Sequence, residues 1–156
     1  MVMGETQDKN GDIRYPQSAV IPFQVKNNRI KILLITSLKT KQWIFPKGII
    51  EKHLTPQESA LHEAAEEAGV EGEVLNINLG EYSYLKWGGI CEVEVYPLHV
   101  TRILKDWPEA DMRRRKWVSI DKATNLIKKK EILNLLKKFE DSTKNILSVI
   151  KNSKSK

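Results

Sequence analysis

The chain has 156 residues, of which 40% are hydrophobic and 29% are charged, as expected for one folded domain with a substantial core. A single cysteine, Cys91, excludes a disulfide within the chain, and no apolar run approaches the length of a membrane helix. The first fourteen residues are polar and do not resemble a signal peptide. We therefore expect a cytoplasmic protein that does not bind a membrane.

The net charge is +6 and is unevenly distributed. Residues 101–156 carry 16 of the 26 Lys and Arg residues but 7 of the 20 Asp and Glu residues. The densest basic runs are Arg113–Lys116 and Lys128–Lys130. Such runs are most often solvated faces, and nucleic-acid binding is the usual alternative. Because the arginine run adjoins a strand pattern at Lys116–Val118, we expect part of it to face a site for a phosphate-rich substrate.

The first third of the chain predicts β-strands. Apolar residues predict strands at Ser18–Val25 and Arg29–Thr36, and Asn27-Asn28 between them is a hairpin turn signal. Trp43–Phe45 predicts a short third strand.

A helix is predicted after the glycine loop at Phe45–Glu51. Thr55 is a good N-cap, Pro56 occupies the first helical position and Glu58 completes a capping box. Gly69 is placed to end the helix.

Three glutamates of this helix, Glu63, Glu66 and Glu67, share one face because positions three and four residues apart are neighbours. Like charges this close repel each other unless a cation lies among them, and magnesium prefers such oxygen ligands. The alternative is a solvated acidic face, which is the usual role of a glutamate-rich helix. The preceding Pro46-Lys47-Gly48 turn favours the metal site.

Beyond this helix, alternating residues predict three further strands, with Gly88-Gly89 as the turn between the last two. The last strand contains Cys91, a core residue in this interpretation. These strands are Glu73–Ile77, Glu81–Tyr84 and Ile90–Tyr96, the last continuing past Pro97 to Leu104.

The final third predicts helices. Asp121 is the expected N-cap of a short helix, and apolar residues recur at helical spacing from Ile132 to Phe139, with a further apolar patch at Ile146–Ile150. The alternating elements predict an α/β/α sandwich around a mixed β-sheet. We expect a single domain over residues 15–150, between a flexible segment at residues 1–14 and a disordered tail at residues 151–156.

From Gly48 to Val70 the sequence resembles the Nudix box, whose pattern is G-(five)-E-(seven)-R-E-U-x-E-E-x-G-U with U an aliphatic residue. Two positions depart from it: Leu54 stands where the family has its first glutamate, and His62 stands where it has arginine. The matching residues are Gly48, Glu63, Glu66, Glu67, Gly69 and Val70.

The resemblance extends over about residues 14–125. Among Nudix proteins, the chain looks most like the diphosphoinositol polyphosphate and diadenosine polyphosphate phosphohydrolases. The segments that carry it are Gln42–Gly48, Leu104–Glu109 and Arg113–Val118. It implies a Nudix-type fold and magnesium-dependent cleavage of a phosphoanhydride bond by water, with manganese as a substitute metal.

The resemblance also implies roles for the box residues. Glu63 and Glu67 would bind magnesium together with a backbone carbonyl near Gly48, and Glu66 would activate the water. The arginine that His62 replaces holds a catalytic glutamate in the family, and histidine lacks its five-donor fork. We expect a working but weakened hydrolase, whereas the alternative for His62 is a hydrogen bond to a neighbour.

Four basic residues are predicted to contact substrate phosphate: Arg114, Lys39, Arg113 and Lys47. Arg114 occupies a position that is basic in the diphosphoinositol-type relatives. The alternative for Arg114 and Lys39 is a solvated surface charge.

Three functions remain open from the sequence. The first is a metal-dependent hydrolase of a phosphorylated small molecule, and the second is a degenerate domain that binds a nucleotide or polyphosphate without cutting it. The third, suggested by the basic final third, is a pyrophosphohydrolase that trims RNA 5′ ends. The sequence does not select the substrate or the oligomeric state.

Overall fold

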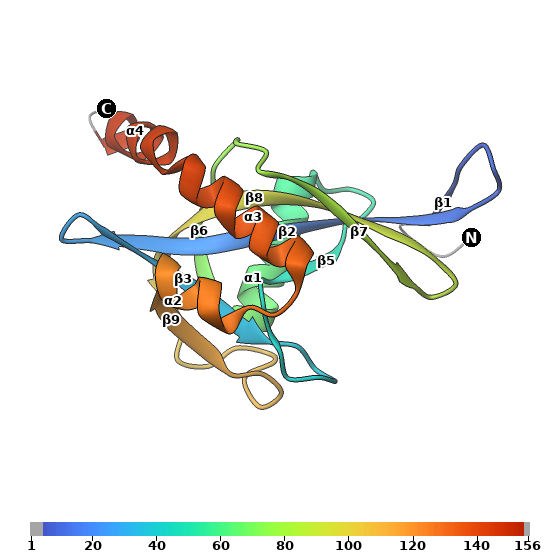
Figure 1. Ribbon diagram of the computed structural model, residues 1–156, viewed down its shortest axis with the longest axis horizontal. Helices are drawn as coiled ribbons and strands as arrows, with labels where there is room; N and C mark the ends of the chain where they lie inside the picture. Colours follow the sequence, from blue (N-terminus) through green and yellow to red (C-terminus); the bar gives the residue numbers. More distant parts are fainter. Residues whose placement is uncertain (1–4, 155–156) are drawn as a thin grey trace.

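The computed structural model describes residues 5–154 and shows a mixed β-sheet with helices on both of its faces (Figure 1). The strands are β1 (Thr6–Gln7), β2 (Ile13–Lys26), β3 (Arg29–Thr36), β4 (Trp43–Ile44), β5 (Lys47–Ile49), β6 (Val70–Val74), β7 (Gly80–Lys86), β8 (Gly89–Ile103) and β9 (Arg115–Ser119). The helices are α1 (Pro56–Ala68), α2 (Ile120–Leu126), α3 (Lys130–Asp141) and α4 (Thr143–Lys154). Within the described part of the chain, no helix has the length and apolar character needed to cross a membrane.

The sheet is built around the two longest strands, β2 and β8. They pair in parallel, so that Tyr15 lies opposite Cys91 and Phe23 opposite His99. The main strand order is β4-β3-β2-β8-β6, while β1 and β5 pair with β2, β7 with β8 and β9 with β3. These other pairs are antiparallel, which makes the sheet mixed, as the sequence predicts.

The two faces of the sheet are covered by different helices. Helix α1 packs on β2, β5 and β6, and its fully buried Ala60, Ala64 and Ala68 allow a close approach. On the other face, α3 lies across the sheet (Figure 1). Phe139 of α3 packs edge-on against Phe23 of β2, with ring centroids 5.5 Å apart. The predicted α/β/α sandwich is therefore confirmed.

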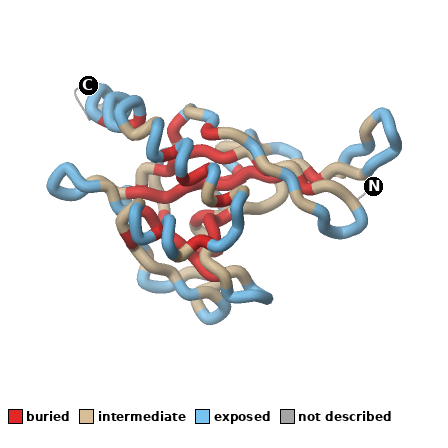
Figure 2. Tube along the Cα trace, in the orientation of Figure 1, coloured by how far each residue is buried: buried red, intermediate tan, exposed pale blue. Residues whose placement is uncertain are grey.

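The buried residues follow the middle of β2 and β8 and the C-terminal part of β3, while the hairpin ends are exposed (Figure 2). Ile32–Ile35 of β3 are completely buried, as expected for a strand covered on both faces. The β1–β2 and β7–β8 hairpins project from the body together (Figure 2).

The local signals around α1 and the first hairpin are confirmed. The Thr55 hydroxyl accepts the N–H of Glu58 at 3.1 Å, and the Glu58 carboxylate accepts the N–H of Thr55 at 3.0 Å. Gly69 ends the helix with φ 65°, a conformation that glycine adopts at little cost. Asn27 and Asn28 form the predicted turn, with φ of 52° and 62°.

Three element predictions need correction. The segment after Pro46 is not only a loop, because Lys47–Ile49 pairs with β2 as β5. The strand predicted at Glu73–Ile77 lies earlier, at Val70–Val74, because pairing with β8 begins directly after Gly69. The N-cap of α2 is Ser119, whose hydroxyl accepts the N–H of Lys122 at 3.2 Å, so Asp121 lies in the first turn.

The two terminal segments are more ordered than predicted. Residues 1–14 were expected to be flexible, yet Thr6–Gln7 pairs with the start of β2, and Asp8 holds the turn between them by accepting N–H groups of Asn10 and Asp12 at 2.9 Å. At the other end, α4 continues to Lys154, because the buried Ile146 and Ile150 tie it to the core. Residues 1–4 and 155–156 lie outside the described part of the chain.

Candidate active site

Glu67 lies in the last turn of α1 and is buried, with 8% of its surface exposed. One carboxylate oxygen, Oε1, accepts the backbone N–H of Lys47 at 3.1 Å. The other, Oε2, lies 3.4 Å from Nη2 of Arg113. Burial raises the pKa of the Glu67 carboxyl, and the charge of Arg113 opposes this shift. The Glu67 carboxylate at the end of α1 is therefore fixed by two partners, the N–H of Lys47 and the guanidinium of Arg113.

Glu63 lies one turn before Glu67, with its carboxyl group against the backbone of Gly48. A Cβ atom at Gly48 would overlap the Glu63 carboxyl, so the absence of a side chain there makes room for it. Burial and then the charges of Glu67 and Glu66 raise the pKa of Glu63. Glu66 is exposed, so the shared face predicted for the three glutamates places two inside and one toward solvent.

The residues around Glu63 and Glu67 fit a magnesium ion. Within the described residues, no three His, Cys, Asp or Glu side chains form a ready-made metal cage. Magnesium, however, is commonly held by one or two carboxylates together with waters and substrate phosphates. Two repelling carboxylates beside a glycine backbone supply such a donor set, and a cation between them would remove the repulsion.

Arg113 is committed to protein partners. Its Nε donates to the Glu109 carboxylate at 2.8 Å, and its Nη1 donates to the carbonyl of Thr36 at 3.0 Å. Together with the Glu67 contact, these bonds use all three nitrogens of the guanidinium, and 8% of the side chain is exposed. Arg113 therefore joins β3, the segment after β8 and the carboxylate of Glu67.

The segment between β8 and β9 also fastens the C-terminal end of α1. The last carbonyls of a helix have no partner within it. Here the carbonyl of Glu66 accepts the N–H of Glu109 at 3.1 Å, and that of Glu67 accepts the indole N–H of Trp107 at 3.2 Å. Arg115 donates to the carbonyl of Ala68 at 3.0 Å, and its guanidinium lies over the Trp107 ring at 3.8 Å. These contacts fix the turn that carries Glu67.

A cleft of about 360 Å³ opens beside Glu67. It contains three of the four predicted phosphate contacts, namely Lys39, Lys47 and Arg113. Lys47 is half-buried, and burial lowers its pKa, an effect that nearby Lys86 and Lys129 increase and Glu67 opposes. The cleft is lined by Ser37, Leu38, Lys39, Thr40, Ile44, Lys47, Glu67, Tyr82, Tyr84, Lys86, Arg113, Lys129, Glu131 and Ile132.

Several cleft residues were not predicted from the sequence. Tyr82, Tyr84 and Lys86 alternate along β7, so one strand face presents all three to the cleft. This period of two is visible in the sequence and would have predicted that the three side chains share one face of the strand. Lys129 belongs to a noted basic run, but no local pattern indicates that the chain before α3 returns to the site.

Arg114 is the predicted phosphate contact that does not line this cleft. It is exposed, and its guanidinium lies over the ring of Trp43 at 5.6 Å from the centroid. Its backbone N–H donates to the Thr36 hydroxyl at 2.9 Å. The structure thus separates neighbouring arginines, with Arg113 inside and Arg114 outside.

Neither departure from the Nudix box is a hydrogen-bond or ion-pair partner of Glu67. His62 is exposed, and its Nδ1 is 3.6 Å from a carboxylate oxygen of Glu51. Leu54 is half-buried, and the nearby Glu58 is engaged in the helix cap. His62 therefore contacts a neighbour outside the glutamate pair, and Glu58 does not take the role of the missing glutamate.

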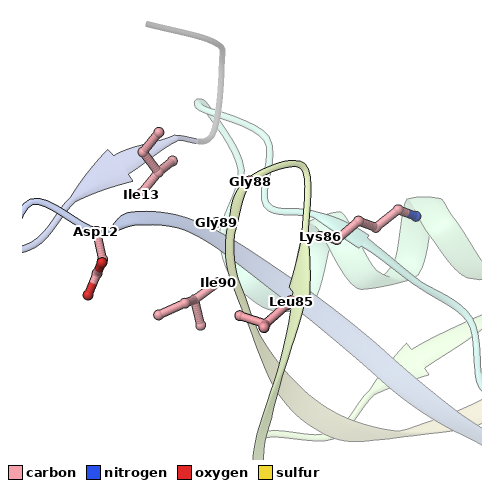
Figure 3. Close-up of a pocket in the computed structure, with 7 residues that line it drawn as sticks. All are labelled: Asp12, Ile13, Leu85, Lys86, Gly88, Gly89 and Ile90. Atoms are coloured by element: carbon pink, nitrogen blue, oxygen red, sulfur yellow. The ribbon is translucent and has the colours of Figure 1, made fainter.

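A second hollow, of about 320 Å³, lies where the β7–β8 hairpin meets the start of β2 (Figure 3). It offers one carboxylate, Asp12, and is otherwise lined mainly by apolar and glycine residues. In Figure 3, the Lys86 side chain extends away from Leu85 and Ile90, as expected for successive residues of a strand. The chemistry of paired carboxylates is found at Glu67 and not here.

The comparisons with known proteins all identify the same family. A family model described as the NUDIX domain matches residues 15–139. The chain is 41% identical over 101 residues to Nudix hydrolase 4 of Arabidopsis thaliana, covering 64% of this chain and 48% of that protein. It is 30% identical over 124 residues to Diphosphoinositol polyphosphate phosphohydrolase 2 of Mus musculus, covering 78% and 66%. The chain thus spans about half the length of the first of these relatives.

The fold is shared with solved structures. A C. elegans Ap4A hydrolase, solved as a binary complex, superposes with a TM-score of 0.70 at 19% identity. The match covers 83% of this chain and 98% of that one. At this identity the likeness concerns the fold alone.

Proposed function

The chain belongs to the Nudix family, and we propose that it is a magnesium-dependent hydrolase that cleaves phosphoanhydride bonds in a phosphate-rich substrate. The observation that carries this proposal is the placement of Glu67 at a cleft that is otherwise rich in cations. A carboxylate pair that favours a cation lies directly beside lysines that favour an anion. A complex of magnesium with a substrate polyphosphate satisfies both.

Each site residue has a physical role in this proposal. Glu63 and Glu67 would hold the metal with a backbone carbonyl near Gly48, and the N–H of Lys47 keeps one oxygen of Glu67 in place. The chemistry that bound magnesium supplies is the neutralisation of charge that develops on the phosphate oxygens as the anhydride breaks. Lys47 and Lys39 would orient the phosphates from the cleft wall.

The reaction adds one water across the anhydride bond. The water oxygen forms a new bond to phosphorus, and the bond from that phosphorus to the bridging oxygen breaks. The water proton passes to a carboxylate base, for which Glu66 is the candidate, and the leaving phosphate departs with the bridging oxygen. Glu66 lies close enough to Glu63 for its charge to raise the pKa of that carboxyl, and this proximity supports the role.

The substrate class rests on the relatives and the charge of the cleft. One relative is named for diphosphoinositol polyphosphate and a structural neighbour for Ap4A, both of which contain phosphoanhydride bonds. We propose a substrate of this phosphate-rich kind, such as a diphosphoinositol, a dinucleoside polyphosphate or a nucleotide derivative. A cytoplasmic location stays a prediction.

A phosphate-release assay tests the function. Purified protein would be incubated with magnesium or manganese and with a diphosphoinositol, diadenosine tetraphosphate, a nucleoside triphosphate or RNA bearing a 5′-triphosphate. We expect metal-dependent release from at least one small molecule, and loss of release with chelator or in Glu67→Gln. Substrate binding without release under every condition would instead identify a domain that binds but does not cut. Release from the RNA alone would identify an RNA-trimming enzyme.

A further inference from the structure

Ser18, near the middle of β2, carries a polar group in the interior of the protein. None of its surface is exposed. Among the described residues, its hydroxyl oxygen Oγ is the one fully buried side-chain oxygen or nitrogen without a hydrogen-bond partner. Leaving a hydroxyl unpaired in the interior costs folding free energy, and buried polar groups of native proteins are nearly always paired. The Ser18 hydroxyl therefore calls for a partner that it gains in another state of the protein.

The sheet register places Ser18 beside Glu63. Ser18 of β2 is paired with Gly48 of β5, and directly paired residues point to the same face, with side chains that start roughly 5 Å apart. A side chain on Gly48 would overlap the carboxyl group of Glu63, so Glu63 lies on this face. Helix α1, which carries Glu63, packs on both strands. The Ser18 hydroxyl and the Glu63 carboxyl therefore lie in the same layer, between α1 and the sheet.

A second carboxylate, Glu94, lies on the other side of Ser18, because the parallel pairing of β2 with β8 sets these two residues opposite each other. One Glu94 oxygen, Oε2, already accepts the hydroxyl of Tyr96 at 2.7 Å. Glu63, by contrast, is repelled by Glu67, so a cation bound between these two carboxylates changes the forces on Glu63. Of the two neighbours, Glu63 is therefore the one that metal binding can bring into hydrogen-bond range of Ser18.

We propose that Ser18 is a positioning residue for the magnesium site, with its hydroxyl donating a hydrogen bond to the Glu63 carboxylate in the cation-bound protein. A carboxylate has two oxygens, so one can accept from Ser18 while the other faces the ion. Hydrogen-bond partners of this kind orient metal ligands, and their loss commonly lowers metal affinity by about 10- to 100-fold. The inference rests on the proposed function for the location of the ion beside Glu63 and Glu67.

This role predicts opposite effects of one substitution without and with metal. In the metal-free protein, Ser18→Ala removes a hydroxyl that has no described partner, so the melting temperature should stay the same or rise slightly. In the presence of metal, the same substitution removes the hydrogen bond to Glu63, so the metal affinity should fall. A hydroxyl with a merely structural role would show the reverse, namely a lower melting temperature without metal and an unchanged affinity.

Titration with Mn²⁺ measures this affinity without any substrate, because the free ion gives an electron paramagnetic resonance signal that is lost on binding. The variants are Ser18→Ala and two matched controls, Ser59→Ala and Glu94→Gln. Ser59 is also buried, but its hydroxyl accepts the N–H of Glu51 at 2.9 Å. We expect Ser18→Ala to raise the Mn²⁺ dissociation constant about tenfold. Ser59→Ala should lower the melting temperature and keep the affinity of the parent, and Glu94→Gln should also keep that affinity.

Four results would overturn the inference. They are a parent that does not bind Mn²⁺, a Ser18→Ala variant that binds as tightly as the parent, a Ser18→Ala variant that melts well below the parent without metal, and a Glu94→Gln variant that loses as much affinity as Ser18→Ala. The last result would show that Ser18 acts through Glu94.

Hydrolysis is measured separately, by phosphate release. A parent whose Mn²⁺ affinity depends on Ser18 but that releases no phosphate from any anhydride would refute the proposed function and leave the role of Ser18 standing. Metal-dependent phosphate release by the parent, together with an unchanged Mn²⁺ affinity of Ser18→Ala, would refute the role of Ser18 and leave the proposed function standing.

Discussion

The two sides of the cleft differ in how their basic residues are used. On the side formed by α1 and the segment before β9, Arg113 is buried and bonded to Glu67, Glu109 and Thr36. On the side formed by β7 and the start of α3, Lys86 and Lys129 line the cleft without an ion pair to a described residue.

This difference indicates a division of work. A planar guanidinium with five donors can join several acceptors at fixed geometry, whereas a lysine ammonium is a mobile point charge. The arginine therefore suits the positioning of Glu67, and the lysines suit an anion that enters and leaves. Variants on each side of the cleft test whether the basic residues have these separate roles.

Glu67→Gln should have the largest effect on turnover, because it keeps the shape of the side chain and removes the charge that would bind the metal. We expect less than about a tenth of the parent turnover, a loss above roughly 1.4 kcal/mol of barrier. Phosphate release measures this effect, and a melting curve establishes that the variant is folded. A variant that retained more activity than this would show that Glu67 is not a metal ligand.

Arg113→Gln should come next, since it leaves the buried carboxylate of Glu67 and the half-buried carboxylate of Glu109 without their cation. Breaking a buried pair from one side costs about 3–5 kcal/mol, so the melting temperature should fall by roughly 6–20 °C. We also expect kcat to fall about tenfold with little change in KM, as for a residue that acts through Glu67.

The matched control for Arg113 is Arg114→Gln, which removes the same charge from the adjacent exposed position. It should leave the melting temperature and kcat close to those of the parent. If Arg113→Gln instead raised KM and melted normally, Arg113 would be a phosphate ligand and the contrast between the two sides would fail.

A smaller effect is expected from Lys39→Ala. Lys39 lines the cleft but is not one of the proposed metal ligands, so its loss should raise KM more than it lowers kcat, by a few-fold. Arg114→Ala provides the comparison, because its guanidinium lies over Trp43 outside the cleft lining. A larger rise in KM for Arg114→Ala than for Lys39→Ala would show that Arg114 contacts the substrate phosphate although it does not line this cleft.

The smallest effect is expected from restoring the Nudix box with Leu54→Glu and His62→Arg. His62 now faces Glu51, and Arg113 already holds Glu67, so the new arginine has less to add than the family pattern implies. We expect a modest rise in turnover or a lower magnesium requirement at pH 7. Activity against magnesium concentration, with a melting curve for each variant, measures this; a stable double variant identical to the parent would show that the departures do not weaken the enzyme.

The sequence alone determined the parts of the site that depend on neighbouring residues. The capping box, Pro56 and Gly69 define α1 within a few residues, because caps are made by local hydrogen bonds. The spacing of Glu63 and Glu67 then places both carboxyl groups on one face, as the structure has them. The β3 strand and its preceding turn were predicted for the same reason, since hairpins pair residues close in sequence.

The tertiary structure decided the parts that depend on distant segments. Arg113 and Arg114 are indistinguishable in the sequence. The side chain of Arg113 is held inside by Glu67, Glu109 and Thr36, whereas Arg114 bonds to Thr36 through its backbone N–H and its side chain stays exposed. Likewise, the ordered start of β2 follows from its parallel pairing with β8, about seventy-five residues later.

The three cleft lysines that come from separate elements show the same limit most directly. Lys47, Lys86 and Lys129 meet because β5 pairs with β2, β7 pairs with β8, and Phe139 anchors α3 against Phe23. None of these contacts is local, so no short pattern in the sequence indicates that the three charges converge. Sequence periodicity fixes which way a side chain points from its own element, and long-range packing fixes what it then meets.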